Sequence, residues 1–198
     1  MNDYFEVFAL PRKLQVDLDA LQRRFYELSR RHHPDFHRMA GEEAQAAVLE
    51  RSAAINRAYR ALRDPLARVE YLIALEEGRE TKEGAEVKPR APTDLLEEML
   101  EIQEALEDAK TAGLDDTSRA RLADERRRLM ERREALEGLL IGAFPEWDGT
   151  LDAGKDRQPV LERFKLALAE RAYLTTVIDD LNDALGESEE GHVSHRRH

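Results

Sequence analysis

The stretch DLDALQRRFYELSRRHHPD, from Asp17 to Asp35, predicts an amphipathic helix that ends just before a proline. Its apolar residues recur at three- and four-residue steps, so they share one side of a helix expected from Asp17 to about His32. The residues on this apolar side are Leu18, Leu21, Phe25 and Leu28. The arginines on roughly the opposite side are Arg23, Arg24, Arg30 and Arg31. This helix should therefore bury one apolar edge and present a basic one.

Pro34 makes its neighbours His33 and Asp35 candidates for a docking contact. Proline fixes its own φ and disfavours helical backbone in the residue before it, so the chain turns here. The imidazole and the carboxylate should then lie exposed at the tip of a helical hairpin. A carboxylate at that place can accept charge-assisted hydrogen bonds from a partner's arginine, and the imidazole can donate another. Taken alone, the tripeptide is also compatible with an ordinary turn between two helices.

A second helical pattern, from Glu42 to Leu62, can pair antiparallel with the first helix. It stops at Asp64-Pro65, again because of the proline. The residues on its common face are Ala44, Val48, Ile55, Tyr59 and Leu62. Two short amphipathic segments, 3–10 and 66–75, are expected to complete a compact four-helix unit over residues 1–76.

Residues 77–92 are rich in Glu, Lys and Gly and contain two prolines, which indicates a linker between domains. The residues that follow, 93–185, predict a three-helix bundle. Its helices are expected at about 93–112, 116–141 and 159–185. The connection 142–158 reads as long and irregular, and Phe144 and Trp147 are expected to anchor it against the bundle.

The composition favours long, solvent-exposed helices, because 37% of the residues are charged and only 6% are aromatic. The absence of Cys excludes disulfides, thiolate metal sites and cysteine nucleophiles from this chain. The net charge of -11 argues against nucleic-acid binding, which needs an excess of Lys and Arg. Residues 1–76 hold 12 basic and 12 acidic side chains, so the whole deficit lies in the remaining residues, as expected of two modules.

The first residues and the apolar runs of the chain suggest where the protein is located, and the last residues suggest a tail. The first ten residues do not have the pattern of a signal or transit peptide. No apolar run approaches the roughly 20 residues that a membrane-spanning helix needs, so we expect a cytoplasmic protein. Residues 186–198 are polar, and we expect them to form a disordered tail.

The surroundings of His33-Pro34-Asp35 resemble those in a J domain. An arginine-rich amphipathic helix precedes the tripeptide, a long helix follows it, and the chain begins with Asp3-Tyr4-Phe5. The long helix ends in Asn56-Arg57-Ala58-Tyr59 and Leu62-Arg63-Asp64-Pro65. The resemblance implies a helical hairpin with a His-Pro-Asp loop plus two short helices over residues 1–76.

Further residues narrow the resemblance to HscB, the J protein of iron–sulfur cluster biogenesis. They are Asp3-Tyr4-Phe5, Phe8, Leu10-Pro11, Ile55-Asn56 and the string LRDPLARVEYL from Leu62 to Leu72. Proteins of this family are all-α, with a J domain, a short linker and a C-terminal three-helix bundle in an L-shaped two-domain arrangement. The resemblance therefore covers the chain as far as Leu185.

The resemblance implies two protein partners and no cofactor. The J domain would engage an ATP-driven chaperone of the HscA or DnaK type and stimulate its ATPase, while the bundle would hold the IscU-type scaffold protein. ATP is bound by the partner, so the chain would be a co-chaperone rather than an enzyme. The residues implied for chaperone contact are His33, Pro34, Asp35, Arg23, Arg24, Arg30 and Arg31. The arginines could equally form a solvated face, as charge runs usually do.

The helix that begins near Asp94 has more apolar surface than one buried stripe needs. Its core face is expected to be Leu95, Met99, Ile102, Leu106 and Ala109. Leu96 and Leu100 stand about 100° or more to one side of that face. Seven acidic side chains occur here before the first basic one, Lys110, so a basic partner would relieve like-charge crowding. Alternatively, the two leucines pack against the third helix or the J domain.

The scaffold-binding face that the resemblance implies is Leu96, Leu100, Glu101, Glu104, Asp108 and Tyr173. The periodicity of the last helix supports Tyr173, which should point away from the core side. That core side is Phe164, Leu174, Ile178, Leu181 and Leu185. Two positions depart from the family pattern, since Glu97 stands in place of an apolar Met and Asp108 shortens a Glu.

Two other interpretations compete with scaffold delivery. A general J-domain co-chaperone with a different client would share the His-Pro-Asp loop. A metal-binding protein would use His32, His33, Asp35 and His37. Pro34 breaks the helix, so His33 and His37 do not share the regular face of a His-x-x-x-His zinc site. The tail histidines, which could bind metal only loosely, are His192, His195 and His198.

Overall fold

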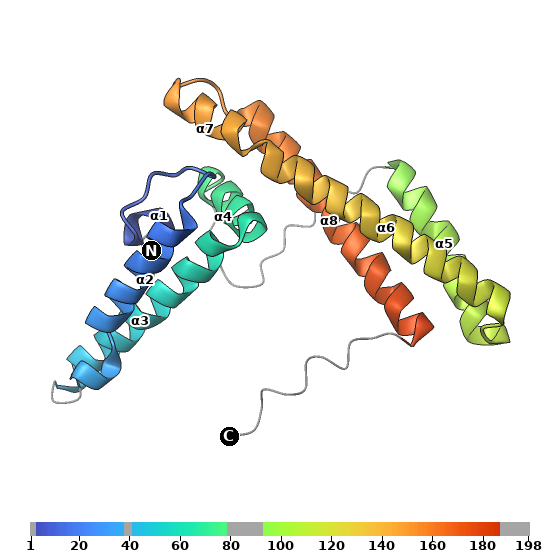
Figure 1. The fold of residues 1–198 in the computed structure, drawn as a ribbon, viewed down its shortest axis with the longest axis horizontal. Coiled ribbons are helices and arrows are strands. Elements are labelled where there is room, and N and C mark those ends of the chain that lie inside the picture. Colours follow the sequence, from blue (N-terminus) through green and yellow to red (C-terminus); the bar gives the residue numbers. More distant parts are fainter. Residues whose placement is uncertain (1–2, 38–40, 79–92, 187–198) are drawn as a thin grey trace. The chain divides into compact units, whose positions relative to one another are not determined.

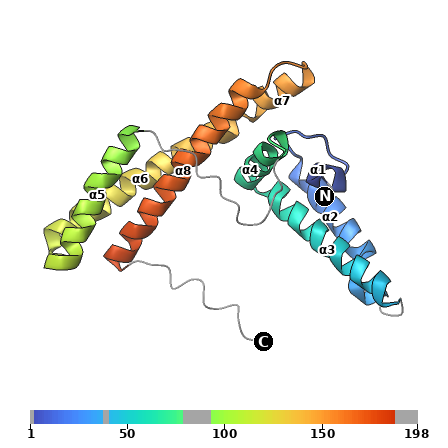
Figure 2. The same cartoon turned by 180° about the vertical axis from the view of Figure 1, so that it is seen from behind.

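The structure is a computed structural model that describes residues 3–37, 41–78 and 93–186, and these ranges contain helices and no strand (Figures 1 and 2). The elements are α1 (Tyr4–Val7), α2 (Leu18–Arg31), the 3-10 turn η1 (Pro34–His37), α3 (Glu42–Arg63), α4 (Pro65–Glu76), α5 (Thr93–Ala112), α6 (Asp116–Gly142), α7 (Phe144–Asp152) and α8 (Gln158–Leu185). The all-α class expected from the sequence is confirmed. The chain forms two compact units, one of Met1–Ala85 with Ile141–Glu162 and one of Glu86–Leu140 with Arg163–His198.

The helices α2 and α3 form the hairpin of the first unit (Figure 1). Asp17 caps α2, because its carboxylate accepts a hydrogen bond from the backbone N–H of Ala20 at 2.9 Å. α3 ends at Asp64, and the carboxylate of Asp64 caps α4 by accepting from the N–H of Leu66 at 3.0 Å. A single aspartate before Pro65 therefore closes one helix and opens the next.

The apolar faces of the hairpin are buried only along part of its length. Leu21 is fully buried on α2, and the buried residues of α3 begin at Ile55. Leu18 and Ala44 are exposed, so their assignment to buried faces was wrong. Each lies in the first turn of its helix.

A buried arginine of α4, Arg68, holds the core of the first unit together. Its guanidinium donates to the backbone carbonyl oxygens of Leu62 at 2.7 Å, Leu14 at 2.5 Å and Arg63 at 3.3 Å. Burial lowers the pKa of Arg68, and the nearby carboxylates of Asp64 and Asp148 oppose that effect. The fully buried apolar side chains of this unit include Phe5, Phe8, Leu14, Leu21, Ile55, Leu62 and Leu72.

One buried carboxylate fixes the N-terminal Asp3-Tyr4-Phe5 segment. Asp3 accepts from the N–H of Phe5 at 3.0 Å, from Nε of Arg12 at 2.6 Å and from the hydroxyl of Tyr71 at 3.0 Å. The ring of Tyr71 also stacks on that of Tyr4, with centroids 4.2 Å apart. Burial raises the pKa of the Tyr71 hydroxyl, which therefore stays protonated and continues to donate. This network holds α1 against α4.

The connection 142–158 contains the helix α7 rather than an irregular loop. Trp147 of α7 is fully buried, and the carboxylate of Asp148 accepts from the backbone N–H groups of Leu14 at 2.8 Å and Gln15 at 3.0 Å. The segment thus contacts the loop before α2 and belongs to the first unit, whereas the sequence pattern predicted that it packs against the bundle. Hydrophobic spacing marks a buried face but does not say which surface covers it.

Two ion pairs and a cation–π contact also hold the segment 142–158 within the first unit. Lys13 Nζ lies 2.7 Å from Asp152 of α7, and Arg157 Nη2 lies 3.2 Å from Glu76 at the end of α4. The guanidinium of Arg157 also lies over the ring of Trp147, 5.7 Å from its centroid. These contacts therefore join the segment 141–162 to residues 1–85 within the first unit.

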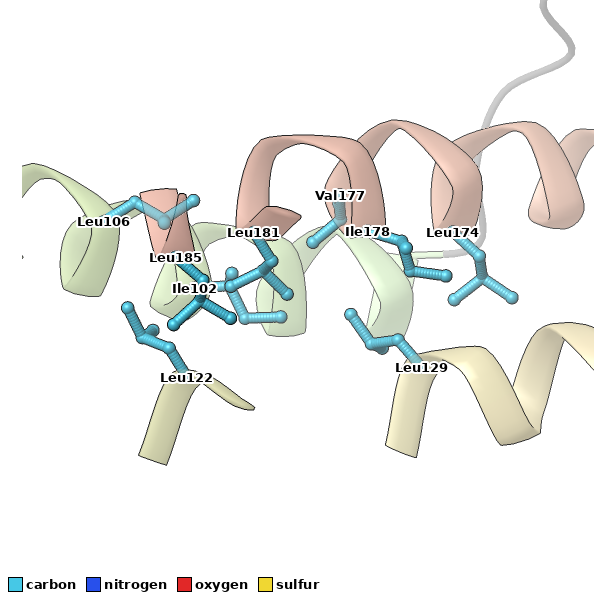
Figure 3. Packing of buried hydrophobic residues seen from close by; sticks show 9 residues of the cluster. All are labelled: Ile102, Leu106, Leu122, Leu129, Leu174, Val177, Ile178, Leu181 and Leu185. Carbon is cyan, nitrogen blue, oxygen red and sulfur yellow. The ribbon is translucent and has the colours of Figure 1, made fainter. Parts of the chain in front are cut away.

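The helices α5, α6 and α8 enclose the core of the second unit (Figure 3). Its buried residues are Ile102, Leu106, Leu122, Leu129, Leu174, Val177, Ile178, Leu181 and Leu185. Arg126 donates to Asn182 at 3.1 Å and Arg132 to Glu170 at 2.7 Å, so α6 and α8 run antiparallel. The helix α5 runs beside the part of α6 that is nearer to the α5–α6 turn (Figures 1 and 2).

Candidate functional site

His33, Pro34 and Asp35 lie where α2 ends and η1 begins. His32 caps α2, because its N–H donates to the carbonyl of Leu28 at 2.9 Å. The side chains of His33 and Asp35 are both about half exposed, at 53% and 57%. The expected exposure of this pair is confirmed.

The backbone holds the His33 ring in a defined orientation. The N–H of Asp35 donates to Nδ1 of His33 at 3.2 Å, and Nδ1 lies 3.7 Å from the Asp35 carboxylate. Nδ1 accepts a hydrogen bond only when it carries no proton, so in the neutral ring the proton is on Nε2. The loop therefore offers one N–H donor and one carboxylate acceptor side by side.

The four arginines of α2 do not form one uniform face. Arg23, Arg30 and Arg31 are exposed, but Arg24 is partly buried. The guanidinium of Arg24 donates to the carbonyl oxygens of Phe8 and Ala9, the latter at 2.9 Å. These carbonyls follow the last turn of α1, so Arg24 fixes the end of that helix instead of standing free on the basic face.

An exposed aromatic residue, Tyr26, lies among the remaining arginines. It is three residues after Arg23 and four before Arg30, spacings that place these three side chains on one side of α2. Its neighbour Phe25 instead stacks on Tyr59 of α3, with centroids 4.0 Å apart. Tyr26 was not predicted as a site residue, although its position away from the apolar stripe was a signal that could have identified it.

A second exposed site lies on α5. Leu100 is 62% exposed, while Ile102 and Leu106 are buried, so the expected separation of Leu100 from the core face is confirmed. The carboxylates of Glu101 and Glu104 are exposed and make no ion pair within the described part of the chain. The side chains of Leu96 and Asp108 lie outside the described residues.

Tyr173 of α8 differs from the expectation. Its side chain is partly buried and packs against the α5–α6–α8 core, so the inference that it points well away from that core was wrong. Val177, four residues later, is buried in the same core. The apolar side of α8 is therefore wider than a single stripe, because α5 and α6 both pack on this helix.

The histidine cluster proposed as metal ligands finds no support in the described geometry. Within 3–37, 41–78 and 93–186, no group of three or more His, Asp or Glu side chains is arranged to hold a metal ion. The side chain of His37 and the tail residues His192, His195 and His198 lie outside the described part. No helix within those ranges is long and apolar enough to span a membrane.

An N-terminal helical hairpin with an exposed His-Pro-Asp loop, together with a C-terminal helical module, defines the class of J-domain co-chaperones. The family model described as the HSCB C-terminal oligomerisation domain matches residues 91–182. Chaperone HscB from Vibrio cholerae is 27% identical, with 91% of this chain and 99% of that one covered and a TM-score of 0.54. The crystal structure of human co-chaperone protein HscB shares the fold at 24% identity, with 92% and 81% covered and a TM-score of 0.61. The family model and the two structural matches together support the HscB family for this chain.

Proposed function

We propose that this co-chaperone binds an iron–sulfur scaffold protein of the IscU type and delivers it to a chaperone of the HscA or DnaK type. Through His33-Pro34-Asp35 it stimulates ATP hydrolysis by that chaperone. The observation that carries the proposal is the presence of two exposed sites of different chemistry, one in each unit. The first is an exposed loop beside a basic face, and the second is an exposed apolar side chain beside acids that make no ion pair among the described residues.

The proposed chaperone contact uses one acceptor and one donor of the loop. Asp35 accepts charge-assisted hydrogen bonds from a cationic side chain of the chaperone, and Nε2–H of His33 donates to an adjacent acceptor. Arg23, Arg30 and Arg31 attract an acidic surface and orient the encounter. Tyr26 adds an aromatic side chain of the kind that is enriched in interface hot spots.

The proposed client contact lies on α5. Burial of Leu100 in an apolar hollow of the scaffold protein provides affinity, because this side chain is mostly exposed in the free chain. Glu101 and Glu104 pair with basic residues around that hollow and accelerate association. Leu96, Asp108 and the accessible part of Tyr173 complete the proposed face.

Replacing Leu96 and Leu100 together by Ala is expected to weaken scaffold binding by about 3 to 4 kcal/mol in total, as for two interface anchors. The melting temperature should change little, because Leu100 contributes little to the core. Titration calorimetry with the scaffold protein and a thermal melt measure the two effects. Leu49→Ala on α3, which removes another exposed leucine, is the matched control and should leave the affinity unchanged.

The same titration separates scaffold delivery from a general co-chaperone role. If the wild-type chain stimulates a DnaK-type ATPase through the loop but shows no binding to the scaffold protein, the client half of the proposal fails. A large loss of stability in the leucine variant with unchanged affinity would instead assign the two leucines to the core.

Arg23→Ala and Arg24→Ala should have opposite consequences. Arg24→Ala removes a charged donor from two carbonyl groups and is expected to lower the free energy of unfolding by about 1 to 3 kcal/mol. Arg23→Ala should leave stability unchanged and raise the chain concentration needed for half-maximal ATPase stimulation, increasingly so at low salt. Denaturant unfolding and steady-state ATPase assays test both, and equal behaviour of the two variants would contradict this division.

A further inference from the structure

A pocket of about 470 Å³ lies in the first unit, at the end of the helical hairpin away from the His-Pro-Asp loop. Its walls come from the loop before α2, the α3–α4 junction and the α6–α7 junction. The pocket lies at the start of α2, whereas the loop follows the end of this 14-residue helix, roughly 20 Å away. Neither proposed contact uses it, and its size is in the range of small-molecule sites.

Most of the side chains in the wall of this pocket are apolar. Leu14 and Phe144 are buried, while Leu18 and Ile141 are 49% and 42% exposed. One exposed leucine or isoleucine is common on a protein surface. Two of them in the same pocket as buried apolar neighbours can instead remove the apolar body of a ligand from water.

The wall also contains a buried cation, Arg68, which is 4% exposed. Three of its five N–H groups donate to backbone carbonyl oxygens, so two have no acceptor among the described residues. The carboxylates of Asp64 and Asp148 act on it, but within the described ranges neither forms an ion pair with it, and both accept from backbone N–H groups. A buried charge without a partner is costly, so an anionic ligand would stabilise Arg68.

Two further features favour a negative charge in this pocket. Arg63, at the end of α3, lines it, is exposed and makes no ion pair in the part of the chain that the structure describes. The helices α2, α4 and α7 also begin here, and a helix N-terminus carries a partial positive charge. Asp17 and Asp64 cap α2 and α4 and offset part of that charge, but α7 has no side-chain cap.

We propose that this pocket binds an aliphatic monocarboxylate, with its carboxylate beside Arg63 and Arg68 and its chain against Leu18 and Ile141. A guanidinium orients such a ligand, because it can donate two parallel hydrogen bonds to one carboxylate. The apolar wall provides affinity for the chain. A cationic ligand with the same chain gains only the apolar part and is repelled by the two arginines.

Titration of octanoate into the isotope-labelled full chain, followed by the amide signals in NMR spectra, tests the proposal. Saturable shifts are expected for Val16, Leu18 and Phe144, because these residues line the pocket. Octylamine carries a similar chain with a positive charge and should bind at least about tenfold more weakly. Equal affinity for octylamine, or octanoate shifts confined to other surfaces, overturns the proposal.

Leu18→Glu separates ligand binding from stability. Leu18 is the first residue of α2 and about half exposed, a position where an acidic side chain favours the helix. The variant should therefore keep its melting temperature and lose octanoate binding, because the new carboxylate repels the ligand. Arg63→Met should raise the dissociation constant roughly tenfold. Leu49→Glu, at an exposed position of α3 outside the pocket, is the matched control.

Wild-type affinity for octanoate in either Leu18→Glu or Arg63→Met overturns the proposal. A blocked peptide that ends in a free leucine carboxylate presents the same charge on a bulkier body. It is expected to bind more weakly than octanoate. If it binds more tightly and shifts the same signals, the pocket is a docking site for a protein C-terminus, and the assignment to a small aliphatic acid is overturned.

Discussion

Asp35→Asn is expected to abolish stimulation of the partner chaperone's ATPase while leaving the fold and the client affinity unchanged. The amide keeps the shape of the side chain but loses the negative charge. A hydrogen bond to a charged group contributes about 1.5 to 3 kcal/mol, so the loss weakens chaperone binding by roughly ten- to a hundredfold. The side chain is more than half exposed, so stability should change by less than about 0.5 kcal/mol.

His33→Gln should have the same effect by a different route. It removes Nδ1 as the acceptor of the Asp35 N–H and replaces the rigid ring with a flexible chain. Both the donor toward the chaperone and the geometry of the loop are then lost. The comparison of the two variants separates charge from loop geometry, since only Asp35→Asn preserves the hydrogen bond within the loop.

A single-turnover ATPase assay of the chaperone, with and without the co-chaperone, measures this effect. Glu27→Gln is the control, because it makes the same chemical change at an exposed position of α2. Circular dichroism and titration with the scaffold protein check the fold and the client contact. Stimulation that survives Asp35→Asn or His33→Gln would show that the loop is not the docking element.

Asp148→Ala is expected to cause the largest loss of stability of any exchange considered, about 3 to 5 kcal/mol. The carboxylate is only 6% exposed and accepts from the N–H groups of Leu14 and Gln15. Its removal leaves two backbone donors without their acceptor. It also removes one of the two carboxylates that stabilise the charged form of Arg68 in the core.

Denaturant unfolding followed by tryptophan fluorescence measures the change next to the mutated site, because Trp147 is the only tryptophan in the chain. Asp152→Ala provides the control on the same helix. It breaks an exposed ion pair with Lys13 and should cost less than about 1 kcal/mol. Similar losses for the two aspartates would contradict the role assigned to Asp148. Asp148→Asn keeps one accepting oxygen and is expected to fall between them.

The sequence predicted the helices well where local chemistry marks their ends. Asp17 provides a side-chain cap for α2, and Pro34 and Pro65 stop α2 and α3 through restrictions on the preceding residue. The exposure of His33, Asp35 and Leu100 followed from the same local rules and helical periodicity. None of these features requires knowledge of how distant segments meet.

The errors share one physical cause, which is that periodicity does not identify the covering surface. Tyr173 lies on a flank of α8, and the packing of α5 decides that it is partly buried. Arg24 has the spacing of a solvated arginine, yet the end of α1 supplies carbonyl groups within its reach. Leu18 and Ala44 have the spacing of residues on the apolar faces, yet both are exposed, because spacing does not show whether another segment covers them.

By itself, the sequence determined the all-α class, the His-Pro-Asp turn and the helix boundaries, because these depend on backbone restrictions and side chains a few residues apart. Only the tertiary structure assigned the segment 141–162 to the first unit and paired Asp148 with the loop before α2. The tertiary structure also showed that Arg24 donates to the carbonyl groups at the end of α1. These outcomes depend on contacts between residues up to more than a hundred positions apart, and hydrogen-bond partners at that separation leave no local pattern in the chain.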